Sequence, residues 1–122
     1  MAPIEFLRVA IKIMDERQGL ASEAESRISA HASYYAVYHL LVQHMQLADI
    51  RYADRKHSMI DSILRGHRPS TSVTRAGLRY FRTLLNLRVR ADYVPQERFA
   101  VTDAEHAIDC AIEVFAAAGQ AP

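Results

Sequence analysis

Three side chains with complementary chemistry stand close together near the end of a basic stretch of the chain. Arg88 is followed by Asp92 and Tyr93 within "LLNLRVRADYVP", residues 84–95. Arginine offers a planar set of donors suited to phosphate and carboxylate. A carboxylate or a phenol can take part in proton transfer. Two interpretations are open: a structural Arg88–Asp92 pair that closes a helix, or an arginine displayed to a phosphate.

The position of Arg88 on a helical wheel of residues 72–93 requires a partner. Arg88 lies at the edge of the apolar face, which consists of Val73, Gly77, Tyr80, Leu84 and Ala91. A charge that is buried alone is costly. Asp92 follows one turn later, so we expect it to pair with Arg88.

A stripe of arginines occupies the opposite side of the same predicted helix: Arg75, Arg79, Arg82 and Arg90. It belongs to a wider excess of positive charge, because residues 51–90 contain ten Arg and Lys but only two acidic residues, although the whole chain carries +1. Such a patch suits RNA or another polyanion. The alternative is a solvated face that is neutralised by the acidic ends of this chain or of a second copy.

Two histidines are further candidates, His39 as a catalytic residue and His57 as a contact for RNA or a protein partner. His39 falls on the expected inward face of a helix over residues 22–47, together with Ile28, Ala32 and Tyr35, where a histidine is more often a hydrogen-bonded core residue than a catalyst. His57, in "RKHSMI", lies in the first turn of the next predicted helix.

The other histidines show no useful pattern: His31, His44, His67 and His106 have no partner at a suitable spacing. No pair of His, Cys, Asp or Glu has metal-ligand spacing. There is no P-loop, GxGxxG or nucleophile-elbow sequence. We therefore expect no metal and no cofactor.

The elements that position these residues are helical throughout. Three- and four-residue apolar spacing predicts helices over residues 3–17, 22–47, 54–65, 72–93 and 102–119. Ser22 with Glu25, and Thr102 with Glu105, form possible capping boxes. Gln18-Gly19 is expected to end the first helix. The prediction is an all-α, antiparallel bundle of four to five helices, forming one domain over residues 1–122.

Composition limits the class of protein. Half of the 122 residues are hydrophobic, which is enough for one compact core. The single cysteine, Cys110, cannot form an internal disulfide, which favours a reducing compartment. No segment is apolar enough to span a membrane. We expect a cytoplasmic protein with no membrane partner.

Four segments in this order resemble HEPN-domain proteins, in particular small stand-alone prokaryotic members: "SRISAHASYYAVYHLLVQHM", "RKHSMIDSIL", "LLNLRVRADY" and "VTDAEHAIDCAIEVFAAA". The resemblance implies an all-helical and usually dimeric protein. Many members are metal-independent ribonucleases of toxin–antitoxin, phage-defence and CRISPR systems, and others pair with a small nucleotidyltransferase. The ribonucleases place a histidine four to six residues after the arginine that corresponds to Arg88.

That histidine is absent here, because Asp92 and Tyr93 stand where it is expected. The leading hypothesis is therefore a non-catalytic or partner-dependent module that binds RNA, a nucleotide or a nucleotidyltransferase in a toxin–antitoxin or defence setting. The alternative is an active endoribonuclease in which His39 or Tyr93 replaces the missing histidine. A helical adaptor that uses its arginines to bind an acidic protein surface is the third hypothesis.

Overall fold

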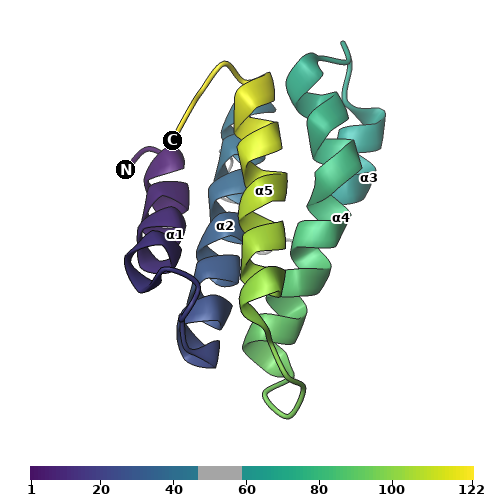
Figure 1. Ribbon diagram of the computed structural model, residues 1–122. Coiled ribbons are helices and arrows are strands. Elements are labelled where there is room, and N and C mark those ends of the chain that lie inside the picture. Colours follow the sequence, from purple (N-terminus) through teal and green to yellow (C-terminus); the bar gives the residue numbers. More distant parts are fainter. Residues whose placement is uncertain (47–58) are drawn as a thin grey trace.

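The computed structural model describes residues 1–46 and 59–122, and these residues form five α-helices and no strand (Figure 1). The helices are α1 (Ile4–Arg17), α2 (Glu23–His44), α3 (Met59–Gly66), α4 (Ser72–Tyr93) and α5 (Val101–Ala117). The predicted all-α bundle is confirmed. The bounds of the predicted helix over 72–93 agree with those of α4.

The four long helices run alternately down and up the molecule, and the short α3 packs beside α4 (Figure 1). α2 lies at the centre, where it contacts α1, α4 and α5. The two chain ends lie at the same end of the bundle, and Arg8 donates a hydrogen bond to the carbonyl of Pro122 over 3.3 Å.

The central position of α2 follows from the small side chains on its buried face: Ser26, Ser29, Ala30, Ala32, Ser33 and Ala36. Small residues let neighbouring helices approach closely. Two of the buried hydroxyls donate to backbone oxygens: Ser33 to the carbonyl of Ser29 over 2.9 Å and Ser29 to that of Ala10 over 3.4 Å. The hydroxyl of Ser26 makes no hydrogen bond within the described residues. Larger side chains complete the single core, among them Tyr34, Phe81, Phe115, Leu7, Leu41, Leu64 and Leu84.

Close packing also joins α4 to its neighbours at Gly77. A Cβ atom at this position would lie 2.9 Å from Cδ2 of Leu41 and 3.2 Å from both Cδ atoms of Leu64. The absence of a side chain therefore lets α4 approach α2 and α3. A larger residue at position 77 would have to displace the ends of these two leucine side chains.

Local signals set most helix ends. Ser22 and Glu25 form the predicted capping box of α2, with N–H···O distances of 3.0 and 3.1 Å. The predicted stop of α1 is confirmed, because Gln18 and Gly19 adopt φ values of 50° and 82°.

The predicted cap of α5 was wrong. The helix begins one residue before Thr102, and the carboxylate of Asp103, instead of Glu105, accepts a hydrogen bond from the N–H of Ala100 over 2.8 Å. Asp103 is acidic and lies three residues after the N-cap residue Ala100. It therefore caps the helix as Glu105 was expected to do, but two residues earlier in the chain.

Three expectations about which residues face inward and where the helices end differ from the structure or fall partly outside the described residues. Ile28 was expected to point inward but is 56% exposed, because the buried side of α2 is its small-residue face. The α2 helix ends at His44, before the predicted residue 47, and residues 47–58 lie outside the described residues. The apolar spacing of the predicted helix over residues 54–65 places Met59 on its inward face, but Met59 is 43% exposed at the start of α3.

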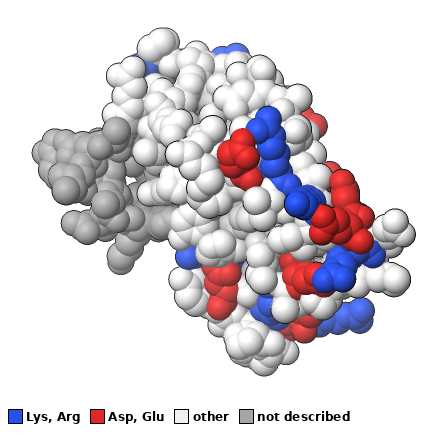
Figure 2. Space-filling model, turned by 90° about the vertical axis from the view of Figure 1, so that its left-hand side faces the viewer, with Lys and Arg blue, Asp and Glu red and all other residues white. Residues whose placement is uncertain are grey.

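The face of the molecule on the α1 side carries basic and acidic side chains next to each other (Figure 2). Three ion pairs involve α1: Arg8–Glu5, Lys12–Glu16 and Arg17–Glu25. The mixed signs give this face no strong field, so it does not suit a polyanion.

Candidate functional site

The predicted pair between Arg88 and Asp92 is confirmed. Nε of Arg88 lies 2.9 Å from Oδ2 of Asp92, and the two side chains are 13% and 20% exposed. The contact is an ion pair and not an aligned hydrogen bond, since this N–H makes no hydrogen bond within the described residues. The i, i+4 spacing on α4 brings the two residues together.

Aromatic rings surround the Arg88 guanidinium. Its central carbon lies 5.0 Å from the ring centre of Tyr93 and 5.6 Å from those of Tyr34 and Tyr35. Nη2 donates to the hydroxyl of Tyr93 over 3.2 Å and to that of Tyr35 over 3.4 Å. Rings at such distances attract a cation through their quadrupoles.

Arg88 keeps its charge in this environment. Burial acts to lower its pKa, but Tyr35, Tyr93, Asp92 and Tyr34 act in the opposite direction, and the net pKa lies above the ordinary value. The nearby phenol of Tyr34 stays protonated, because burial raises its pKa. The site therefore presents a fixed positive charge next to the neutral phenol of Tyr34.

A histidine from another helix completes the group. Nδ1 of His31, on α2, lies 2.7 Å from Oδ2 of Asp92, the same oxygen that faces Arg88. The imidazole also packs on Tyr35, with ring centres 4.6 Å apart. Its side chain is 44% exposed, so solvent and ligands can reach it. We call these residues the Arg88 cluster: His31, Tyr34, Tyr35, Arg88, Asp92 and Tyr93.

His31 was the member that the sequence did not indicate, and the expectation that it lacks a partner was wrong. His31 and Asp92 are 61 residues apart in the chain, and their contact exists only because α2 and α4 pack together. One local signal was available: His31 and Tyr35 share a face of α2 through their i, i+4 spacing. His44 also has a partner, the hydroxyl of Thr71 at 2.9 Å.

The end of α4 is held in place by Arg27 of α2. Its guanidinium donates to five backbone carbonyls at and beyond the end of α4: Arg90, Ala91, Val94, Pro95 and Glu97. Carbonyls at a helix end have no partner within the helix. The side chain is 15% exposed, so these bonds are partly shielded from water. Arg27 thereby fixes the last turn of α4, which carries Asp92 and Tyr93.

His39 lies outside the Arg88 cluster. Its ring is stacked on Phe6 of α1 with centres 5.6 Å apart, and it lies 5.9 Å from the ring of Tyr35. Burial lowers its pKa, so the imidazole is neutral at pH 7. Among the described contacts none joins His39 to Arg88, which agrees with the core interpretation of this histidine.

The arginine stripe on α4 is partly neutralised by the chain itself. Arg82 lies 2.9 Å from Asp61 of α3, which also pairs with Arg65. Arg90 lies 3.4 Å from Asp103 and 3.6 Å from Glu97.

Two members of the stripe remain unpaired within the described residues. Arg75 and Arg79 form no ion pair with any described residue, and Arg79 lies over the ring of Tyr80 at 5.5 Å. They carry the positive charge that this side of α4 offers to a polyanion. His57, the other residue expected to contact RNA or a partner, lies outside the described residues.

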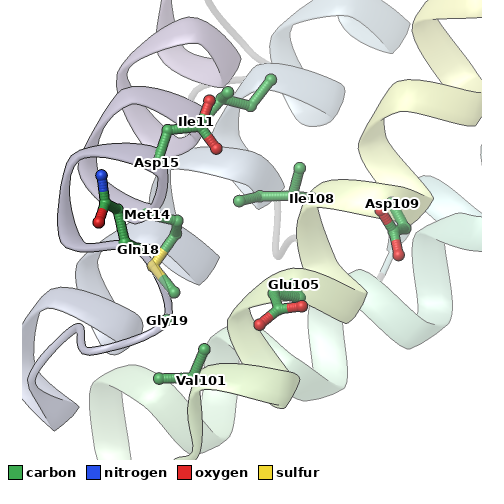
Figure 3. A pocket seen from close by; sticks show the side chains of 9 residues that line it. All are labelled: Ile11, Met14, Asp15, Gln18, Gly19, Val101, Glu105, Ile108 and Asp109. Atoms are coloured by element: carbon green, nitrogen blue, oxygen red, sulfur yellow. The ribbon is translucent and has the colours of Figure 1, made fainter.

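A separate cleft of about 390 Å³ lies between α1 and α5 (Figure 3). Its apolar part is formed by Ile11, Met14, Val101 and Ile108. Its acidic side chains are Asp15, Glu105 and Asp109. Carboxylates repel phosphate, so this cleft does not suit the ligand that Arg88 would bind.

The described residues support neither a metal site nor a membrane-spanning helix. No group of three or more His, Cys, Asp and Glu side chains among them could hold a metal ion. None of the described helices is long and apolar enough to cross a membrane.

Comparison with known proteins gives one match. Neither the curated proteins nor the solved structures include a significantly similar chain. The family model described as the HEPN domain matches residues 5–120, which include the Arg88 cluster and all of the five helices except the first residue of α1. A HEPN domain indicates a nucleotide- or RNA-related module in general. Because the match covers nearly the whole length, the chain belongs to the HEPN domain family.

Proposed function

We propose that the protein is an RNA-binding HEPN module that holds a backbone phosphate with Arg88. The observation that supports this most is a guanidinium with a permanent charge next to the exposed ring of Tyr93, which is 64% exposed. Single-stranded nucleic acids are bound by this combination, in which a cation meets the phosphate and an aromatic ring stacks on a base.

The geometry explains how a phosphate reaches Arg88. Nη2 of Arg88 is covered by the hydroxyl of Tyr93, which is the last residue of α4. A rotation of this exposed side chain uncovers Nη2 and does not disturb the core. A phosphate oxygen then replaces the phenol oxygen as acceptor, and a charge-assisted hydrogen bond replaces a neutral one.

The exposed arginines Arg75 and Arg79 extend the binding surface along α4. They contact the RNA backbone without reading its sequence, as arginine contacts to phosphate generally do. The setting in a toxin–antitoxin or defence system and a nucleotidyltransferase as protein partner belong to this proposal through the family resemblance alone.

The test is a titration of a fluorescently labelled single-stranded RNA, followed by anisotropy, together with a melting curve on the same sample. We expect Arg88→Met to melt at the parental temperature or higher and to weaken binding at least about tenfold, which is the loss of one charge-assisted contact. Arg8→Gln, an exposed arginine on α1, is the matched control and should bind as the parent does. A folded Arg88→Met protein that binds RNA like the parent would exclude this function.

The ribonuclease alternative requires an acid–base group beside Arg88. His39 does not contact Arg88 in the described structure, whereas His31 shares Asp92 with it. This observation keeps the alternative open and leads to the inference below.

A further inference from the structure

We propose that His31 is the acid–base residue of the Arg88 cluster and that the protein uses it to cleave RNA. The inference rests on the proposed function, because it requires an RNA phosphate at Arg88. It assigns a catalytic role to a residue of α2, not to a residue of the Arg88 segment on α4 where the family resemblance places the histidine.

The hydrogen bond to Asp92 determines which nitrogen of His31 is available. Asp92 forms an ion pair with Arg88, and the carboxylate of an ion pair can only accept hydrogen bonds. Nδ1 of His31 therefore carries the proton and donates it to Oδ2 over 2.7 Å. Nε2 is left with its lone pair, and it makes no hydrogen bond with any described residue. A carboxylate orients a catalytic histidine in the same way in other hydrolases.

Packing further limits the movement of the imidazole. The ring of Tyr35 covers one side of it at 4.6 Å, and Tyr35 in turn accepts a hydrogen bond from Arg88. His31 is thus held by a carboxylate and by a ring that both contact Arg88. A surface histidine with only a structural role does not need two such contacts, since an exposed ion pair adds little to stability.

The imidazole of His31 and the guanidinium of Arg88 contact the same oxygen of Asp92. Nδ1 of His31 lies 2.7 Å from this Oδ2 atom, and Nε of Arg88 lies 2.9 Å from it. A phosphate that binds Arg88 therefore lies beside His31, and so does the ribose that precedes it. The 2′-hydroxyl of this ribose is the nearest acidic group of an RNA strand to its own phosphorus. DNA has no hydroxyl there, so the same arrangement can bind DNA but cannot cleave it by this route.

The reaction is a transfer of the phosphoryl group within the strand. Nε2 of His31 takes the proton of the 2′-hydroxyl, and the 2′-oxygen forms a bond to phosphorus. The bond between phosphorus and the 5′-oxygen breaks, and this oxygen takes a proton from water. Arg88 stabilises the charge that develops on the phosphate oxygens. The products are a 2′,3′-cyclic phosphate and a free 5′-hydroxyl, and the imidazolium returns its proton to the solvent.

The experiment incubates the purified full chain with a labelled single-stranded RNA in the presence of a metal chelator and separates the products on a denaturing gel. His31→Ala should leave RNA affinity unchanged and lower the cleavage rate by about 10²–10⁴-fold, the usual contribution of a general base. Added imidazole should restore part of the rate, because it can occupy the space that the side chain leaves. A DNA strand of the same sequence should remain intact.

Two further variants keep the test decisive. His31→Asn retains an N–H donor for Asp92 and lacks the base, so it replaces His31→Ala if that variant does not fold. His106→Ala, an exposed histidine on α5, should cleave like the parent and serves as the control for contaminating nucleases.

The outcomes separate the two proposals. A parent that binds RNA without cleaving it overturns the role of His31 and leaves the binding function in place. Cleavage by His31→Ala at the parental rate also overturns it. A parent that does not bind RNA overturns the proposed function and this inference together. Loss of cleavage with retained binding, followed by rescue with imidazole, supports the inference.

Discussion

Arg88 occupies a position in which an apolar side chain would pack at a lower desolvation cost. It is 13% exposed and is held by one carboxylate and three phenol rings. A buried ion pair often contributes less to stability than the apolar residues that could replace it. Removing only one partner is different, because it leaves an uncompensated charge.

This asymmetry predicts opposite effects of two substitutions. Arg88→Met should leave the free energy of unfolding unchanged or raise it. Asp92→Ala should lower it by about 1–3 kcal/mol, because Arg88 loses its ion-pair partner and His31 loses its hydrogen-bond partner. Urea unfolding of both variants provides the measurement. An Asp92→Ala protein as stable as the parent would show that the pair has no structural role. An Arg88→Met protein that cannot fold would show that the core depends on the charge.

His39 predicts how stability depends on pH. Burial lowers its pKa in the folded protein below the ordinary 6.5. The unfolded chain therefore binds a proton at a higher pH than the folded chain. The stabilisation is complete above about pH 6.5 and is lost as the pH falls below that value.

The measurement is the melting temperature between pH 7.5 and about 5, a range in which histidines titrate while the carboxylates stay mostly ionised. We expect a decrease toward low pH that is smaller in His39→Gln, because glutamine does not titrate. His106→Gln, at an exposed position, should retain the parental decrease. Equal slopes in the parent and in His39→Gln would contradict the prediction.

At the scale of the helix, α4 presents two surfaces with different roles. One side carries Arg88 against α2, and the other carries the arginine stripe. The arginines of the stripe differ in their ion pairs. Arg82 already pairs with Asp61, whereas Arg75 and Arg79 pair with no described residue.

The salt dependence of RNA binding should reflect this difference. For a single strand, each phosphate neutralised contributes about 0.7 to the slope of log K against log salt. Substitution of both Arg75 and Arg79 by Gln should therefore flatten the slope by more than Arg82→Gln does alone. Titrations at several salt concentrations give the slopes. If the double variant keeps the parental slope, the stripe is a solvated face that RNA does not touch.

The parts of α4 that could be predicted depend on neighbours in the sequence. Its two ends follow from the apolar spacing and from Pro95, which lies just beyond the last helical residue. The Arg88–Asp92 pair follows from the i, i+4 spacing of the two residues. The role of His31 could not be predicted, because its contact with Asp92 spans 61 residues and depends on the packing of α2 against α4. The cap of α5 was assigned to the wrong pair, since Thr102–Glu105 and Ala100–Asp103 have the same spacing and differ by two residues in register.

At the scale of the whole molecule, some apolar side chains have no cover in the described monomer. Ile28 on α2 is 56% exposed, and Val89 on α4 is 39% exposed. The family resemblance implies a dimer, and an apolar surface that one small bundle cannot bury is typical of a symmetric interface.

We therefore predict a homodimer in solution, to be measured by sedimentation at micromolar concentration. Ile28→Glu places a charge on this surface and should shift the equilibrium toward monomer. Val9→Glu, at an exposed position on α1 that is 52% accessible in the parent, is the matched control and should sediment like the parent. A parent that is monomeric under these conditions would rule out the dimer.

The contacts of Arg27 have a consequence for the motion of the site. Helix ends usually open and close independently of the rest of a domain. Here a guanidinium on α2 holds the carbonyls of Arg90, Ala91 and Val94, so the last turn of α4 cannot open unless α2 and α4 separate. The amide protons of this turn should then exchange with solvent only when the bundle unfolds. Under the proposed function, Arg88, Asp92 and His31 would already have their binding arrangement before RNA arrives, so that binding would cost little conformational entropy.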